Sequence, residues 1–326
     1  MEIANSYRRI PEKYFMTNIN SQLQIISEGI RNCSFENTYK VSWIRAIIEC
    51  LLEGKNREKE IALEDIAVNM FKHYWNQTIF FDLEQGQNIN KKPLIVQLVK
   101  EQIEFYQNRY NNFKPEYFAK VQNKISIDTK RIVQIIKRDV SWRFQKDLDL
   151  YSLNLKENNL ILHNPTLLIS NSDLLLELIS YRWTQILETF NSSPKIANKV
   201  KGTDKENIKR KSLTQFHKYL DLENPDRVCF LTNAKIEEGE LSVHHVIPWS
   251  YLYSDDLWNL VYSKKTANSK QSNKLPSKEL ILKLEKRNSD LLNCMKTNLT
   301  RHKQTAELER AIQSDYVQKF WIGCKG

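Results

Sequence analysis

The front half of the chain carries apolar residues at three- and four-residue steps, which is the spacing of one face of a helix. The clearest such stripe spans residues 63–74, and a preceding one at 41–53 stops at Gly54, a residue that readily takes the left-handed conformation that ends helices. Similar stripes lie at 95–106 and 132–136. The pattern therefore predicts a mainly helical front region whose stripes form its core.

The pattern changes between Leu148 and Leu162, where apolar residues alternate with polar ones around the turn-like run at 157–159. Alternation of this kind predicts a small β-hairpin. A further helix follows, with Asn171 or Ser172 as its N-cap and an apolar stripe that ends at Phe190.

A polar, lysine-rich stretch at 191–212 follows this helix. We place the division between two domains there, with a mostly helical recognition or partner domain at 1–195, a basic linker at 196–220 and a second domain at 221–326. The linker is either a solvated connection or a strip that contacts phosphates. The chain from Ser277 onward is again largely helical by pattern.

The 326 residues carry a formal net charge of +10 and a pI of about 9.2, which favours a polyanion such as DNA or RNA as a partner. The 5 cysteines are scattered and none belongs to a Cys-x-x-Cys pair, which fits a reducing cytoplasm. The first residues lack the apolar core of a secretory signal and no apolar run has the length of a membrane span, so we expect a cytoplasmic protein with no membrane partner. No Gly-rich nucleotide-binding loop is visible, which argues against ATP hydrolysis.

The only adjacent histidines of the chain, His244 and His245, precede an Ile-Pro step and a run of Asn, Ser and Lys. Residues 239–247 have strand character, and neighbours on a strand point to opposite faces, so the two histidines can have different roles. The later run SKKTANSKQ would form a short helix that returns Asn268 toward the strand. Phosphodiester cleavage requires a base to activate water, a cation beside the phosphate and groups that hold both, and this segment can supply all three.

The segment 229–277 resembles the ββα-metal finger of HNH endonucleases, a family that includes restriction enzymes, homing endonucleases and one nuclease domain of the RNA-guided CRISPR effectors. The resemblance rests on His244-His245, Ile247-Pro248, Asn259 and Asn268, which stand in the family's order. It implies an α+β protein, in which a mainly α-helical N-terminal domain is followed by a C-terminal ββα-metal (HNH) finger with trailing helices.

The resemblance also implies roles for these residues. His245 would be the general base, since the neutral form of histidine is well populated near pH 7. His244 and Asn268 would be the protein ligands of a divalent metal, and Asn259 would pin the loop and help to orient the base. The nucleic-acid backbone would be held by the lysines of the following segment, Lys264, Lys265, Lys270 and Lys274.

Two departures from the family pattern bear on cofactors. Many relatives have Asp where His244 stands, and imidazole favours softer ions than a carboxylate does, so we expect Mg²⁺ or Mn²⁺, with nickel, cobalt or zinc as alternatives in vitro. Some relatives hold a structural zinc with two Cys-x-x-Cys pairs, but here Thr232 stands where the partner of Cys229 would be, so no structural zinc is expected. The finger would instead be held by apolar residues such as Phe230, Leu231, Val246, Ile247, Trp258 and Leu260.

The resemblance implies a metal-dependent endonuclease that hydrolyses DNA, in bacterial restriction or anti-phage defence. A homing or mobile-element nuclease is the enzymatic alternative. The alternative from another class is a nucleic-acid-binding subunit that no longer cuts or that needs an activating partner, and the intact His245 and Asn268 favour the enzyme. DNA is the expected partner, with a protein partner or a homodimer left open.

The other histidines show no partner spacing and are interpreted as structural or exposed: His73, His163, His217 and His302.

Overall fold

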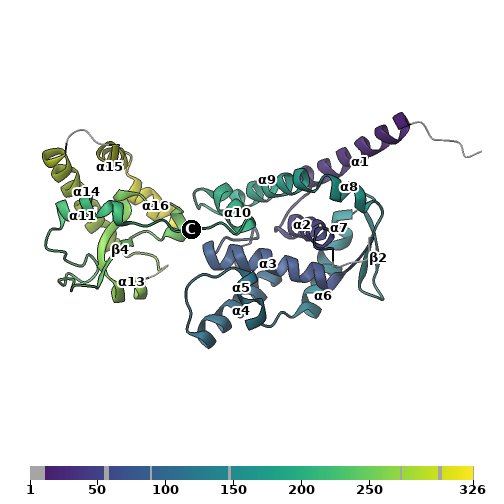
Figure 1. The fold of residues 1–326 in the computed structure, drawn as a ribbon, viewed down its shortest axis with the longest axis horizontal. Helices are drawn as coiled ribbons and strands as arrows, with labels where there is room; N and C mark the ends of the chain where they lie inside the picture. Colours follow the sequence, from purple (N-terminus) through teal and green to yellow (C-terminus); the bar gives the residue numbers. More distant parts are fainter. Residues whose placement is uncertain are drawn as a thin grey trace, which may run out of the picture. The chain divides into compact units, whose positions relative to one another are not determined.

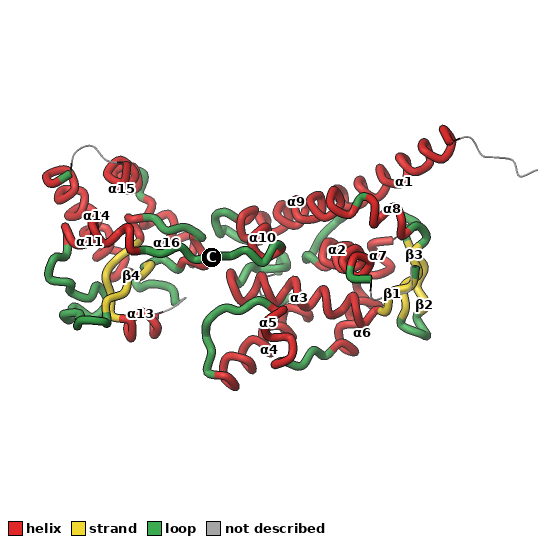
Figure 2. The backbone as a smooth tube through the Cα atoms, in the orientation of Figure 1, coloured by secondary structure: helices red, strands yellow, loops and turns green. Residues whose placement is uncertain are grey.

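The computed structural model describes residues 12–54, 59–88, 90–145, 148–271, 274–299 and 303–325 (Figure 1). Contacts divide the chain into two compact units. The first contains the described residues up to Phe190 together with Thr203–Glu206, and the second contains Asn191–Gly202 and the described residues from Asn207 onward. Helices dominate and the described strands form small sheets, in agreement with the expected α+β class (Figure 2). None of the described helices has the length and apolar character that crossing a membrane would require.

The first unit is built mainly from helices around an aromatic core that includes the fully buried rings of Trp43, Trp75 and Trp183. The predicted stripes at 41–53 and 63–74 lie in its second and third helices, and Gly54 has the left-handed backbone that was expected, with φ of 64°. The helices are α1 (Glu12–Asn32), α2 (Tyr39–Leu52), α3 (Leu63–Phe81), α4 (Leu94–Tyr110), α5 (Phe118–Val121), α6 (Thr129–Asp139), α7 (Ser141–Gln145), α8 (Pro165–Ser170) and α9 (Ser172–Phe190), with a 3₁₀ turn η1 (Gln122–Lys124).

A three-stranded antiparallel sheet completes the first unit (Figure 2). The predicted hairpin consists of β2 (Tyr151–Asn154) and β3 (Asn159–Leu162). Strand β1 (Glu60–Ala62) pairs with the other edge of β3, so the order is β1-β3-β2. The sequence did not predict β1, because three residues are too few to show an alternation.

The second unit contains a two-stranded antiparallel sheet, β4 (Leu241–His245) with β5 (Leu260–Lys264), surrounded by helices. Its core includes five of the apolar residues that the sequence suggested, and the Phe320 ring stacks on one of them, Trp258, with centroids 5.7 Å apart. The helices are α10 (Ile196–Asp204), α11 (His217–Glu223), α12 (Trp249–Leu252), α13 (Lys265–Gln271), α14 (Lys278–Asn298), α15 (Lys303–Gln313) and α16 (Tyr316–Lys325), with 3₁₀ turns η2 (Thr214–Phe216) and η3 (Leu257–Asn259).

The stretch expected as a linker, residues 196–220, carries α10, in which Ile196, Lys199 and Val200 are buried. Lys199 donates hydrogen bonds to the Tyr251 carbonyl and to a serine hydroxyl. Burial lowers the pKa of its ammonium to about 7, because the charged form is poorly solvated there. This part of the chain is therefore folded and packed.

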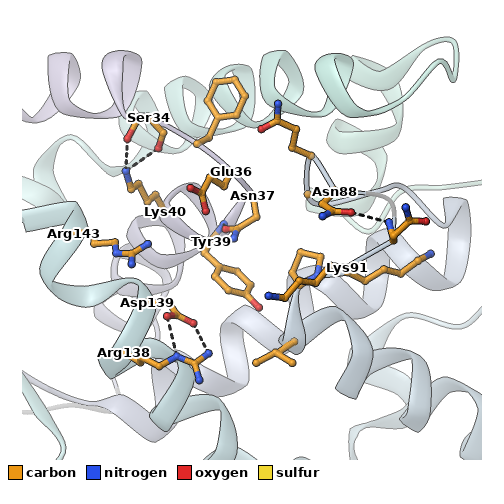
Figure 3. A pocket seen from close by; sticks show the side chains of 17 residues that line it. Ser34, Glu36, Asn37, Tyr39, Lys40, Asn88, Lys91, Arg138, Asp139 and Arg143 are labelled. Carbon is orange, nitrogen blue, oxygen red and sulfur yellow. Dashed lines mark hydrogen bonds and ion pairs between the residues drawn. The ribbon is translucent and has the colours of Figure 1, made fainter.

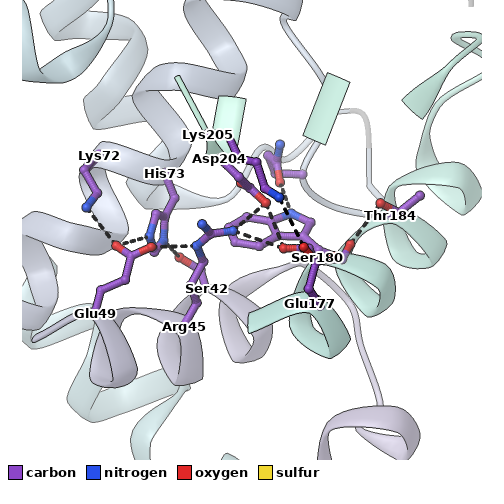
Figure 4. A network of polar contacts seen from close by, with 12 residues as sticks. Ser42, Arg45, Glu49, Lys72, His73, Glu177, Ser180, Thr184, Asp204 and Lys205 are labelled. Carbon is purple, nitrogen blue, oxygen red and sulfur yellow. Dashed lines mark hydrogen bonds and ion pairs between the residues drawn. The ribbon is translucent and has the colours of Figure 1, made fainter. Parts of the chain in front are cut away.

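A network of polar side chains ties the end of α10 into the first unit (Figure 4). At its centre, Arg45 donates from Nε to Glu49 Oε1 at 2.8 Å and from Nη1 to Asp204 Oδ2 at 2.6 Å. His73, which the sequence indicated as structural or exposed, contacts Glu49 Oε2 through Nε2 at 3.0 Å. The buried guanidinium has two carboxylate partners, as a charge in a protein interior requires.

Two further histidines have other partners. His163 contacts the Ser152 hydroxyl at 2.7 Å, and the ring of His217 packs edge-on against Tyr262. His302 lies outside the described residues.

Candidate active site

Strands β4 and β5 and helix α13 bring the histidine pair and Asn268 together. The strands are antiparallel, in a register that places His245 opposite Leu260. Helix α13 begins at Lys265, directly after β5, and returns Asn268 to β4. There the side-chain amide of Asn268 donates to Ser242 Oγ at 2.9 Å, which fixes the side chain against the strand.

His244 and Asn268 form one polar pair, with Nδ1 of the ring 2.7 Å from Oδ1 of the amide. An amide oxygen only accepts hydrogen bonds, so Nδ1 carries the ring proton and Nε2 carries the lone pair. This Nε2 is buried and has no hydrogen-bond partner among the described residues. Burial lowers the pKa of His244 to about 4 and outweighs the hydrogen bond to Asn268, which acts to raise it. The imidazole of His244 is therefore neutral at pH 7.

His245 has a different partner, Asp255, whose Oδ1 lies 2.9 Å from Nε2 of the ring. A carboxylate only accepts, so Nε2 carries the proton of the neutral ring and Nδ1 is left to accept another. The two side chains are 11% and 19% exposed, which shields the pair from most of the solvent. The sequence pattern did not point to Asp255. The only feature of the sequence that marks Asp255 is the acidic pair Asp255-Asp256 in the loop after the strand.

Asn259 is fully buried and fixes the chain where it leaves β4. Its Oδ1 accepts from the Ile247 N–H and its Nδ2 donates to the Ile247 carbonyl, both at 2.8 Å. Its own carbonyl accepts from the Val246 N–H at 3.0 Å. Asn259 thus holds the two residues that follow His245, and among the described contacts the ring of that histidine is held by Asp255.

A cavity of about 250 Å³ lies over these groups. Both histidines, Asp255 and Asn268 line it together with Arg210 and Lys211. The Arg210 guanidinium lies 4.7 Å from the centre of the Trp249 ring, which lines the same cavity and restricts where the guanidinium can point. The sequence did not distinguish these two cations, because they stand in a lysine-rich stretch where every basic residue looks alike.

Three of the four lysines expected to hold the nucleic acid lie outside the lining of this cavity. Lys264 ends β5, Lys265 donates through Nζ to the Gly239 carbonyl, and Lys274 is exposed. None of these three lines the cavity that contains the histidines. The side chain of Lys270 lies outside the described residues. Binding of DNA by these lysines stays a prediction.

Helix α14 holds the segment that carries Asn259. Arg287 of this helix is buried, and its Nε donates to Glu223 Oε2 at 3.1 Å. The guanidinium and the side-chain amide of the adjacent Asn288 also donate to backbone carbonyls on either side of Asn259, those of Leu257, Trp258 and Leu260. A helix that follows α13 in the chain therefore fixes the loop that carries Asn259.

Within the described part of the chain, no three His, Cys, Asp or Glu side chains converge as a metal site. A divalent ion held by His244 and Asn268 would therefore have two protein ligands and would keep positions for water and phosphate oxygens. The donor set fits such an ion, because the imidazole is neutral and the amide oxygen is adjacent to it. To bind a cation through Nδ1, the neutral ring of His244 would carry its proton on Nε2 instead.

Residues 229–277 match the family described as HNH endonuclease. The matched segment contains β4, β5 and α13 with both histidines, Asp255, Asn259 and Asn268. The second unit thus carries a segment similar to HNH endonucleases, which indicates nuclease chemistry. The match leaves out the first unit, Arg210 and Lys211. No curated protein and no solved structure matches the chain.

Proposed function

We propose that the protein is a metal-dependent endonuclease that hydrolyses phosphodiester bonds in DNA, and that β4, β5 and α13 form a ββα-metal finger. The observation that carries the proposal is the convergence of two polar pairs, His245 with Asp255 and His244 with Asn268, in one cavity beside Arg210. This arrangement supplies a base with a free lone pair, a neutral donor set for a cation, and a fixed cation for a phosphate.

In this proposal, Nδ1 of His245 takes a proton from the attacking water. Asp255 holds the ring through Nε2–H and stabilises the imidazolium that forms. Arg210 and Lys211 hold oxygens of the scissile phosphate, to which a guanidinium can donate two parallel hydrogen bonds. His244 and Asn268 would hold the divalent ion, which supplies Lewis-acid stabilisation of the charge on the phosphate and on the departing oxygen.

Cleavage of supercoiled plasmid by the purified protein tests the proposal. The parent should produce nicked or linear DNA with Mg²⁺ or Mn²⁺, and a folded His245→Ala variant should not. One finger holds one set of catalytic groups and cuts one strand, so the ratio of nicked to linear product reports whether two copies act together. Parent protein that shifts DNA in a gel but never cuts it, in any of the metals, would instead favour a binding subunit or one that needs an activating partner.

We further propose bacterial restriction or anti-phage defence as the setting, which is supported only by the resemblance of the finger to such enzymes. Bacteria that produce the parent protein should form fewer phage plaques than bacteria that produce the His245→Ala variant. Equal plaque counts across a panel of unrelated phages, with active enzyme present, would argue against defence and for a mobile-element nuclease.

A further inference from the structure

A cavity of about 1070 Å³ lies in the first unit, beside the start of α2 (Figure 3). Residues from three stretches that are distant in sequence line it: 34–40, then 86–88 with 90–94 before and in α4, and 138–143 at the junction of α6 and α7. All three belong to the first unit, so the cavity is complete without the nuclease finger.

The first two of these stretches are joined by backbone contacts. The Thr38 N–H donates to the Gln85 carbonyl at 3.0 Å. Gly86 lies so close to Pro93 that a Cβ atom at this glycine would come within 3.0 Å of the proline ring. Backbone hydrogen bonding and this close contact hold the two stretches in place, so little ordering is needed when a ligand binds.

The lining carries more positive than negative charge. Its cations are Lys40, Lys91, Lys92, Arg138 and Arg143, and its carboxylates are Glu36 and Asp139. Arg138 pairs with Asp139 at 2.7 Å, and Lys92 pairs with a glutamate outside the lining at 2.8 Å. Among the described residues no carboxylate pairs with Lys40, Lys91 or Arg143. The lining therefore carries an excess of positive charge, and the cavity favours an anion.

Hydrogen-bond donors stand beside these cations. Asn37 and Asn88 each accept a backbone N–H through Oδ1 at 3.0 Å, which leaves their amide nitrogens available to a ligand. The Tyr39 hydroxyl points into the cavity (Figure 3) and accepts from the Ile95 N–H at 3.0 Å. Burial raises the pKa of Tyr39, so this hydroxyl keeps its own proton and can donate it.

We infer that this cavity binds one nucleotide unit of a DNA strand, with its phosphate against Lys91 and Arg143 and the edge of its base against Asn37 and Asn88. The inference rests on the proposed function, which makes DNA the substrate, and it gives the first unit the task of holding the strand. The charged lining disfavours an apolar ligand, and a phosphate alone would leave the two amides unused. The volume exceeds the roughly 300 Å³ of the smallest ligand pockets, so a base and its phosphate fit together.

The test is the binding of a fluorescently labelled single-stranded oligonucleotide to the full chain, measured by anisotropy in EDTA over a series of salt concentrations. For Lys91→Gln/Arg143→Gln the dissociation constant should rise about tenfold or more, and the logarithmic salt slope should fall by about 0.7, because the two cations hold one phosphate of the single strand. The matched control, Lys130→Gln/Lys156→Gln, removes the same charge at exposed lysines outside the cavity and should change neither quantity appreciably. Equal effects of the two double variants would overturn the inference.

Competition identifies the ligand. A deoxynucleoside monophosphate should displace the oligonucleotide at concentrations at which inorganic phosphate does not. Displacement by both alike, or by neither, would overturn the nucleotide site. These readouts do not depend on cleavage: a parent protein that binds in this way but never cuts plasmid would disprove the proposed function alone. A plasmid-cutting protein whose double variants bind alike would disprove this inference alone.

Discussion

The carboxylate of Asp255 lies 2.9 Å from Nε2 of His245, although the two residues stand on different elements and are separated by the bend at Pro248 and by helix α12. This contact fixes both the orientation of the imidazole and the nitrogen that carries its proton. In the proposed mechanism the nitrogen left to act as the base is therefore Nδ1, and the orientation of the ring is set by a residue of the loop.

Substitution Asp255→Asn should slow DNA cleavage about 100-fold, because an amide can present its NH₂ group to the ring and favour the wrong tautomer, and it carries no charge to stabilise the imidazolium. Single-turnover rates with saturating protein measure the effect, and DNA affinity should not change. Asp256→Asn is the matched control, since that carboxylate accepts from the Ser254 hydroxyl at 2.6 Å and is absent from the lining of the cavity. Comparable losses in both variants would show that Asp255 acts on the loop as a whole rather than on the base.

The concentration of metal that cleavage requires should depend on Asn268. Removing divalent ions with EDTA should abolish cleavage, and Asn268→Ala should raise the Mn²⁺ concentration for half-maximal rate about tenfold or more, because one of two protein ligands is lost. Ser269→Ala serves as the control, since Ser269 lines the same cavity and its hydroxyl donates to the Lys265 carbonyl. An unchanged metal requirement in Asn268→Ala would remove this residue from the ligand set.

The hydrogen bonds from Arg287 and Asn288 of α14 to the loop around Asn259 predict an effect on the stability of the protein. Substitution Arg287→Met should lower the free energy of unfolding by about 3 kcal/mol, since it removes the guanidinium that donates to two buried residues' carbonyls and to the Glu223 carboxylate. The midpoint of urea unfolding, followed by tryptophan fluorescence, measures the loss. Lys286→Met, at the exposed neighbouring position of the same helix, should leave the midpoint nearly unchanged. A midpoint that moved equally in both variants would contradict the stabilising role of the Arg287 hydrogen bonds.

Lys199 predicts a pH dependence of stability. Its pKa of about 7 in the folded chain lies below the ordinary 10.5, so the unfolded chain binds more protons between these pH values. Stability therefore rises with pH across this window, by up to about 1.4 kcal/mol per pH unit. Urea unfolding at pH 7 to 9.5 should show a flatter rise in Lys199→Met than in the parent. Lys201→Met, at an exposed position on the same helix, should keep the parent's slope, and identical slopes in all three proteins would refute the assignment.

Local periodicity predicted the elements that depend on local sequence. The stripes of α2 and α3 are visible because each helix buries one face in the same core, and the β2–β3 hairpin is visible because four-residue strands flank a turn. The helix α10 was assigned to a linker because its lysine-rich sequence resembles a solvated strip, and nothing local indicates that Lys199 is buried.

The candidate site also combines features that local sequence predicts with features that depend on the fold. The spacing of His244, His245, Asn259 and Asn268 is a property of the chain and could be read from the sequence. Asp255 and Arg210 reach the histidines only because the loop and the stretch before the finger fold back over β4. Contacts of this kind depend on tertiary structure, and a single sequence carries no pattern for them.

The bonds from Arg287 and Asn288 to the carbonyls around Asn259 limit how the proposed nuclease site can be transferred to another protein. A fragment cut at residues 229–277 would contain every motif residue and yet lack the side chains that donate to three carbonyls of the loop around Asn259. An engineered fusion that borrows the cutting activity should therefore carry the chain through α14 at least, and should begin early enough to include Glu223 and the cavity residues Arg210 and Lys211. The smallest fragment expected to fold with the site intact is therefore longer than the segment that matches the HNH family.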